Sequence, residues 1–181
     1  MTTTPVSATL ESGVPVSVVI VSRDRPEALR RCLTGVGQLQ YAPFEVIVVA
    51  DPAGIAVARD MVFAEALKLV TYDSPNISAA RNLGIAEAAG EVVAFIDDDA
   101  VPEPLWLRHL LEPAQRPGVA AMTGFVRGRN GISFQYRARQ LNALGEPENL
   151  DVDPETPSIL PPPPGGAIKT EGTNMAFRRD V

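Results

Sequence analysis

Short apolar runs alternate with amphipathic segments over roughly the first two thirds of the chain. The runs are rich in β-branched residues and have no polar face, as expected of strands covered on both sides of a sheet. The intervening segments repeat apolar residues at helical spacing. The predicted strands span residues 16–21, 44–50, 68–72, 92–96 and 119–126, and the predicted helices span 26–36, 55–66, 77–90 and 106–111.

This alternation predicts a Rossmann-like α/β fold. Strands that alternate with helices form a mostly parallel sheet, with helices on both faces and right-handed crossovers between neighbouring strands. A chain of 181 residues is long enough for one domain with a substantial core. We therefore expect one domain over residues 15–181, preceded by a loose tail over residues 1–14.

The regular pattern stops after the fifth predicted strand. Proline becomes frequent there, with four in a row at 161–164 followed by two glycines, and these residues break up long elements. We expect residues 145–168 to form a long surface loop. The segment before it, residues 133–144, is predicted to be a short helix carrying Arg137 and Arg139.

Composition and charge exclude several classes of protein. The hydrophobic fraction of 45% and the charged fraction of 21% are those of a soluble globular protein. A net charge of −6 argues against non-specific nucleic-acid binding. The N-terminal residues lack the pattern of a signal peptide, and no apolar run approaches the roughly 20 residues that span a bilayer. We expect a cytoplasmic protein, and attachment of a longer parent protein to a membrane stays open.

Cys32 is expected to be a buried apolar residue.

Three consecutive carboxylates, Asp97-Asp98-Asp99, follow the apolar run 92–96. Like charges repel, so this cluster needs either a cation or full solvation. The carboxyl end of a strand is where open α/β sheets bind ligands. Mg²⁺ or Mn²⁺ held by carboxylates, with substrate phosphates in its shell, fits this position. The alternative is a solvated acidic turn in which Asp99 caps a helix that begins near Pro102.

Other polar residues are expected near the same edge of the sheet. Asp51 also ends a strand and is suited to a ribose hydroxyl or a base edge, or else is a turn residue before Pro52. Arg81 lies in the first turns of a helix, where backbone amides attract anions, or else belongs to a solvated face. Arg23 and Arg25 carry the same two readings. Ser22 has no histidine partner for a hydrolase triad, since His109 is the only histidine.

Taken together, these segments resemble the family 2 glycosyltransferases, which have the GT-A fold. The resemblance runs from about Val16 to the end of the chain. It rests on the order and spacing of four segments, none of them specific alone: Val-Ser-Val-Val-Ile-Val at 16–21, Ser-Ala-Ala-Arg-Asn-Leu-Gly at 78–84, Val-Val-Ala-Phe-Ile-Asp-Asp-Asp at 92–99 and Gly-Thr-Asn-Met-Ala-Phe-Arg-Arg at 172–179.

The resemblance implies transfer of a sugar, of the hexosyltransferase type, from a nucleotide-diphosphate sugar to an acceptor that the sequence does not identify. It implies inversion and dependence on Mg²⁺ or Mn²⁺. The nucleotide-binding part is expected over 15–126, and an incomplete, loop-rich acceptor side over 127–181. The residues it assigns to nucleotide binding are Ser22, Asp51, Arg81, Asp97 and Asp98. The resemblance assigns Asp97 and Asp99 to metal binding, as a DXD motif. It assigns Gly172, Thr173 and Asn174 to the side of the site that holds the donor sugar and the acceptor.

One feature departs from the family. The catalytic base of such enzymes is commonly an acidic residue downstream of the segment that ends at Arg179, and Asp180 follows that segment too closely. We therefore expect the base to lie beyond Val181. The alternative is a nucleotide-sugar-binding module without turnover. A signalling receiver domain, which also gathers aspartates around Mg²⁺, is disfavoured because Lys169 comes too late in the chain.

Overall fold

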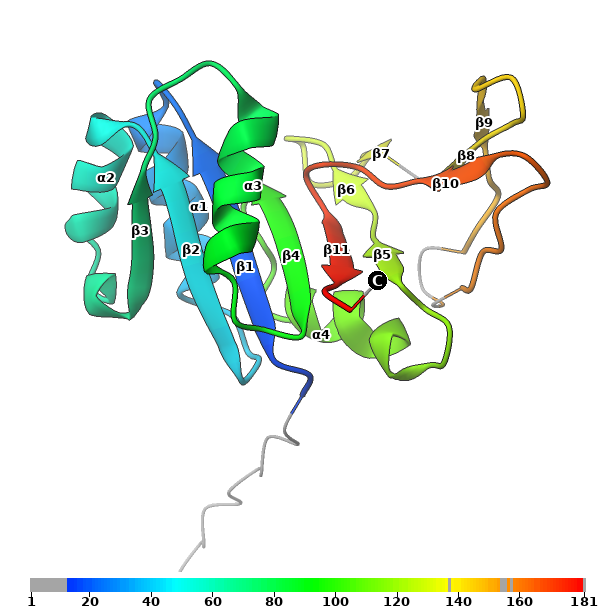
Figure 1. The fold of residues 1–181 in the computed structure, drawn as a ribbon, viewed down its shortest axis with the longest axis horizontal. Helices are drawn as coiled ribbons and strands as arrows, with labels where there is room; N and C mark the ends of the chain where they lie inside the picture. The colour runs from blue at the N-terminus through cyan, green and yellow to red at the C-terminus, as the bar shows by residue number, and fades with distance from the viewer. Residues whose placement is uncertain (1–12, 137, 154–155, 157, 181) are drawn as a thin grey trace, which may run out of the picture.

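The computed structural model describes residues 13–136, 138–153, 156 and 158–180. Its centre is a six-stranded sheet with the order β3-β2-β1-β4-β11-β5 (Figure 1). β1 to β4 are parallel, and β11 runs antiparallel to both of its neighbours. The sheet is therefore mostly parallel, and the predicted α/β fold is confirmed. Its strands are β1 (Val16–Ser22), β2 (Phe44–Ala50), β3 (Leu67–Thr71), β4 (Val92–Asp97), β5 (Ala121–Thr123) and β11 (Met175–Arg178).

Helices cover both faces of this sheet. One face packs against α1, α2 and α4 through Leu29, Ile55 and Leu107. The other face packs against α3, which lies in front of the strands in Figure 1. The helical elements are α1 (Pro26–Val36), α2 (Pro52–Arg59), α3 (Ile77–Glu87) and α4 (Trp106–Leu111), with 3₁₀ turns η1 (Ala64–Ala66) and η2 (Glu112–Gln115).

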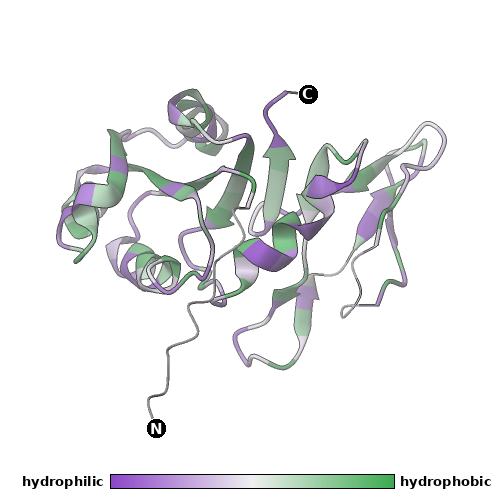
Figure 2. Ribbon diagram, turned by 90° about the horizontal axis from the view of Figure 1, so that it is seen from below, coloured by the Kyte–Doolittle hydropathy of each residue, from purple (hydrophilic) through white to green (hydrophobic). Residues whose placement is uncertain are grey.

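The apolar strands supply side chains to both halves of the core. In β1, Val18 and Ile20 belong to the cluster under α1, whereas Val19 belongs to the cluster under α3. Figure 2 shows the resulting distribution: the central strands are mostly hydrophobic, and the helices carry hydrophobic and hydrophilic residues together. Gly84 lets α3 approach closely, because a Cβ there would collide with Val19. Cys32 is fully buried, as predicted, and burial raises the pKa of its thiol to about 12.

Several predicted boundaries differ from the structure. The helix predicted over 55–66 is α2 followed by a turn and η1, because Asp51 caps it early and Asp60 ends it. The helix predicted to end at Gly90 ends at Glu87. Of the predicted tail over 1–14, residues 1–12 lie outside the described residues, and the Gly13 N–H donates to Ala42 O at 3.1 Å.

The prediction for the region after β4 was wrong in three places. The strand predicted over 119–126 divides into β5 and β6, which join different sheets. The helix predicted over 133–144 is instead β7 and β8, because Asn142 forms a turn through its side chain and pairs β8 with β9. The loop predicted over 145–168 contains β9 and the start of β10. Arg139 lies in β8, and Arg137 lies outside the described residues. These strands are β6 (Val126–Arg127), β7 (Phe134–Tyr136), β8 (Arg139–Leu141), β9 (Pro147–Asn149) and β10 (Ala167–Lys169).

The described helices are all short. None of them combines the length and the apolar character that crossing a bilayer requires.

Candidate functional site

A cleft of about 430 Å³ opens at the carboxyl ends of the parallel strands. It contains the end of β1, the three aspartates at the end of β4, and the loop that leads into α3. The polar residues that line it are Ser22, Arg23, Arg25, Tyr72, Ser74, Asn76, Asp97, Asp98 and Asp99. Ser22 and the aspartate triplet therefore share one cavity. Asp51, Arg81 and the segment 172–174 are not among its lining residues.

The register of the sheet explains which side chains meet. β1 pairs with β4 so that Val21 is opposite Asp97, which brings Ser22 level with Asp98. β11 pairs with β4 so that Met175 is opposite Phe95, which brings Thr173 beside Asp97. Residues about 76 positions apart in the chain are joined in this way, since Ser22 bonds to Asp98 and Thr173 bonds to Asp97.

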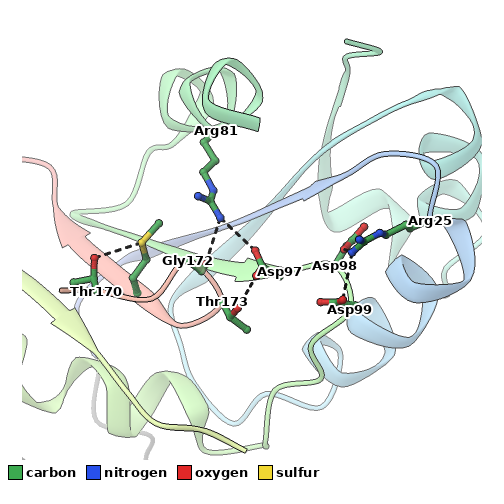
Figure 3. Close-up of polar contacts among 9 residues, drawn as sticks. Arg25, Arg81, Asp97, Asp98, Asp99, Thr170, Gly172 and Thr173 are labelled. Atoms are coloured by element: carbon green, nitrogen blue, oxygen red, sulfur yellow. Dashed lines mark hydrogen bonds and ion pairs between the residues drawn. The ribbon is translucent and has the colours of Figure 1, made fainter. Parts of the chain in front are cut away.

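Asp97 is held from two sides. The Thr173 hydroxyl donates to Oδ2 at 2.6 Å, and Arg81 Nη2 lies 3.3 Å from Oδ1 (Figure 3). The Arg81 guanidinium also donates to Gly172 O at 3.5 Å and lies over the Phe95 ring, 5.7 Å from its centroid. A Cβ at Gly172 would lie 2.8 Å from Arg81 Nη2, so glycine leaves room for the guanidinium. The structure therefore brings Asp97, Arg81, Gly172 and Thr173 together.

Asp98 and Asp99 point to other partners. Asp98 is buried and accepts a hydrogen bond from the Ser22 hydroxyl at 2.7 Å. Arg25 Nη1 lies 3.4 Å from Asp98 and 3.3 Å from Asp99. Burial raises the pKa of Asp98 above its usual range, although the Ser22 hydrogen bond and the Arg25 charge act in the opposite direction. Asp99 does not cap a helix near Pro102, because α4 begins at Trp106; the capping alternative is wrong.

Asp51 is engaged with the backbone on both carboxylate oxygens. Oδ1 accepts from the Gly54 N–H at 2.8 Å, which caps α2. Oδ2 accepts from the Asp24 N–H at 3.0 Å. Asp24 has φ 58°, a backbone conformation that residues other than glycine rarely adopt. The hydrogen bond from its N–H to Asp51 helps to hold this conformation. Asp51 thus fixes the loop after β1 that carries Arg25.

Asn174 is also engaged on both sides of its amide. Its Oδ1 accepts from Trp106 Nε1 at 2.9 Å, and its Nδ2 donates to Phe125 O at 3.2 Å. A Cβ at Gly124 would lie 2.5 Å from that Nδ2. In the sequence Trp106 marks only a helix, and no local pattern indicates its long-range bond to Asn174.

The donor set fits a divalent cation with incomplete protein ligation. Among the residues the structure describes, no group of three histidine, cysteine or acidic side chains converges on one point. Mg²⁺ commonly uses only one or two carboxylates and completes its shell with substrate phosphates and water. Asp97 and Asp99 both line the cleft and are partly exposed. Two hard oxygen donors beside an open cavity meet that requirement.

The sequence profile described as glycosyl transferase family 2 matches residues 17–180. The chain is 36% identical over 118 residues to the O-antigen biosynthesis protein RfbC of Myxococcus xanthus, covering 61% of this chain and 9% of that protein. It is 30% identical over 153 residues to the pre-mycofactocin glycosyltransferase of Mycobacterium tuberculosis, covering 81% of this chain and 32% of that protein. The chain therefore spans a third or less of either relative.

A solved structure has the same fold. The mannosyltransferase PcManGT from Pyrobaculum calidifontis, in complex with GDP-Man and Mn²⁺, superimposes with a TM-score of 0.64 at 18% sequence identity. The match covers 93% of this chain and 45% of that one. At this identity the similarity concerns the fold, and it agrees with the mostly parallel sheet described above.

Proposed function

The chain belongs to glycosyl transferase family 2, and on that premise we propose that it transfers a sugar from a nucleoside-diphosphate sugar to an acceptor hydroxyl. The observation that carries this proposal is the meeting of Asp97, Asp98 and Asp99 with Arg25 in one cleft at the strand ends. Carboxylates and a guanidinium side by side suit a ligand that combines a cation with a diphosphate.

We assign the divalent cation, Mg²⁺ or Mn²⁺, to Asp97 and Asp99. When bound, it would stabilise the negative charge that develops on the leaving diphosphate. The PcManGT structure, a complex with GDP-Man and Mn²⁺, supports the use of a divalent cation. The Thr173 and Arg81 contacts fix the direction of the Asp97 carboxylate before any ligand arrives. Such preorganisation lowers the cost of binding.

We assign the nucleotide to Ser22, Asp51, Arg81, Asp97 and Asp98. Asp51 accepts two backbone hydrogen bonds, and a carboxylate has about four lone-pair sites, so it retains capacity for a base or ribose donor. Asp98 and Ser22 bond to each other in the cleft wall and are suited to a ribose hydroxyl. Residues 15–126, which contain these side chains, would form the nucleotide-binding part.

We assign residues 172–174 to the donor-sugar and acceptor side, within residues 127–181. Thr173 and Gly172 reach the cleft indirectly, through Asp97 and Arg81. The Asn174 amide is engaged by Trp106 and Phe125, so its contribution is to hold the preceding turn. Direct displacement with inversion needs a base on the acceptor hydroxyl and a stabilised leaving group. The residues assigned above to the cation and the nucleotide would stabilise the leaving diphosphate.

A second candidate function is donor binding without transfer. One observation favours it: the carboxylates of Asp51, Asp97, Asp98 and Asp99 all have protein partners. A general base must be within reach of the acceptor hydroxyl and able to take up its proton. Carboxylates that bind cation and nucleotide do not serve that role.

A thermal-shift panel tests the proposal. We expect the melting temperature to rise when one nucleoside diphosphate is added together with Mn²⁺ or Mg²⁺. The rise should be smaller with the nucleotide alone or the metal alone. The added stability should grow with the logarithm of the ratio of ligand concentration to Kd. The same panel identifies the base. The absence of a metal-dependent shift with UDP, GDP, ADP, CDP and dTDP would refute the donor site.

A second assay separates the two candidate functions. Release of the nucleoside diphosphate from its sugar donor, measured with a panel of saccharide and lipid-linked acceptors, would establish transfer. Nucleotide binding in the first assay without release in the second would favour the binding module.

A further inference from the structure

Arg25 already occupies the position of a cation in the aspartate triplet. Its Nη1 lies 3.4 Å from Asp98 Oδ1 and 3.3 Å from Asp99 Oδ2. The side chain comes from the start of α1, and Figure 3 shows it on one side of the aspartates with Arg81 on the other. Two guanidinium groups, one from the residue before α1 and one from α3, therefore flank the three carboxylates.

The two arginines are held very differently. Arg81 is 25% exposed, contacts Asp97 and Gly172 O, and lies over the Phe95 ring. Arg25 is 58% exposed and has no ring contact among the described residues, and its ion pairs, like that of Arg81, are longer than the roughly 2.7–2.9 Å of strong charge-assisted hydrogen bonds. Exposed ion pairs of this kind contribute little and are screened by salt. Arg81 is thus the more enclosed of the two, whereas Arg25 can leave the aspartates at small cost.

Departure of Arg25 would leave the Asp98 carboxylate in position. Asp98 is 7% exposed and is held by the Ser22 hydroxyl at 2.7 Å. The Asp51 carboxylate fixes the backbone of Asp24, so the root of the Arg25 side chain is also stationary. The movement is therefore confined to one side chain that lines the cleft.

We propose that Arg25 is a tethered counterion: it offsets part of the negative charge of Asp98 and Asp99 until a divalent cation binds, and it then turns to the diphosphate of the donor. This inference rests on the proposed function. A guanidinium matches phosphate geometry with two parallel hydrogen bonds, so the exchange gives Arg25 a better partner. A cation that binds alone must displace Arg25 without that compensation. Cation and nucleotide therefore favour each other's binding.

The test compares two affinities in three variants. Free Mn²⁺ is measured by electron paramagnetic resonance, first with Mn²⁺ alone and then with the nucleoside diphosphate that stabilises the wild type. Arg25→Gln should bind Mn²⁺ alone more tightly, by up to about fivefold. It should bind the nucleotide with Mn²⁺ more weakly, by about tenfold, because it loses a charged hydrogen-bond donor to phosphate. Opposite signs in the two measurements are the signature of the tethered counterion.

Arg30→Gln is the matched control. Arg30 lies on α1, the helix that Arg25 directly precedes. It is 40% exposed, pairs with Asp60 at 3.0 Å, and does not line the cleft. It should change neither affinity. Arg25→Lys keeps the charge without the two-pronged donor, so it should leave Mn²⁺ affinity near the wild-type value and weaken nucleotide binding. This variant also covers the case in which Arg25→Gln fails to fold.

Two results would overturn the inference while leaving the proposed function intact. In one, Arg25→Gln and Arg25→Lys bind both ligands as the wild type does. In the other, Arg25→Gln loses affinity for Mn²⁺ alone, which would make Arg25 a support for the carboxylates. A wild-type protein that binds no nucleotide with Mn²⁺ would instead refute the donor site itself.

Discussion

The indole nitrogen of Trp106 donates a hydrogen bond to Asn174 Oδ1 across 2.9 Å and ties α4 to the turn before β11. The same amide donates to Phe125 O, and the Asn174 carbonyl accepts from the Thr123 hydroxyl. Three segments are joined at one residue. The neighbouring Thr173 hydroxyl bonds to Asp97, so this junction is connected to the cleft through Thr173 and Asp97.

Trp106→Phe removes the indole N–H and keeps an aromatic ring. The partly buried Asn174 oxygen then lacks its donor, so we expect the free energy of unfolding to fall by about 1–2 kcal/mol. Urea denaturation measures the change. His109→Gln on the exposed side of α4 should have no effect. Equal stability of Trp106→Phe and the wild type would show that Asn174 finds another donor.

Asp51 has a structural role that two substitutions can separate. Asp51→Ala removes the cap of α2 and the acceptor for the Asp24 N–H, and should cost about 2 kcal/mol. Asp51→Asn can still cap α2, because its amide oxygen accepts from Gly54, so it should cost less. Thermal or urea unfolding of both variants provides the comparison. An equal loss in the two variants would mean that the Asp24 contact is the more important one.

Asp99→Asn should weaken metal-dependent nucleotide binding by about tenfold or more while changing stability little, because Asp99 is 46% exposed and its ion pair with Arg25 is of the weak, exposed kind. Isothermal titration with Mn²⁺ and the stabilising nucleotide measures the effect, and chelation of the metal should abolish binding to the wild type. If Asp99→Asn unfolds the protein while the metal has no effect on the wild type, the assignment of Asp99 to the cation is wrong.

Two glycine substitutions should have opposite consequences. Alanine at Gly172 meets the flexible end of Arg81, which can shift, so stability should change little while Arg81 is displaced from Asp97. We therefore expect weaker nucleotide binding. Alanine at Gly84 meets the buried Val19 side chain and should cost about 1–3 kcal/mol of stability. Unfolding and nucleotide titration on both variants distinguish the effects, and loss of stability at Gly172→Ala would contradict this division.

Glu45 makes stability depend on pH at the opposite end of the sheet. Burial by itself raises the pKa of Glu45, but hydrogen bonds from Lys68, the Ser17 hydroxyl and the Ala89 N–H outweigh it and lower the pKa to about 2. Because the folded pKa lies below the ordinary value of 4.5, the stabilisation is complete above about pH 4.5. It is lost as the pH falls towards 2.

Glu45→Gln should therefore be less stable than the wild type at about pH 7, by about 1–3 kcal/mol. The difference should shrink steadily between about pH 4.5 and about pH 2. Urea unfolding at neutral pH and at two acidic pH values within that window measures it, with the exposed residue Glu65→Gln as the control. A difference that stays constant with pH would show that the Glu45 carboxylate charge is not what stabilises this network.

The parallel strands of the central sheet could be predicted because each has a clear local sequence pattern. Runs such as 16–21 and 92–96 are apolar and β-branched, and the aspartates directly after the second run mark the edge where the cleft lies. The signal weakens where a strand has only two to four residues. The run 119–126 reads as one strand, but Gly124 and Phe125 interrupt it to accommodate the Asn174 amide.

The contacts within the site could not be predicted, because they depend on register between distant strands. Ser22 meets Asp98 and Thr173 meets Asp97 only once β1 and β11 have paired with β4. The turn between β8 and β9, unlike those contacts, has a local sequence pattern that indicates it. Asn142 followed by Gly145 is a turn pattern, and Gly145 adopts φ 79°. A turn at this position is incompatible with the helix predicted over 133–144.

The position of β11 between β4 and β5 has a consequence for synthesis of the chain on the ribosome. β1 to β4 can assemble as soon as they emerge, because they pair among themselves. Among the described strands of the central sheet, β5 pairs with β11 alone, so it must wait until residues 175–178 have left the exit tunnel. During that interval β4 presents an unpaired apolar edge, the kind of surface that associates with other chains. The triplet at the end of β4 would place negative charge beside that edge while it is open.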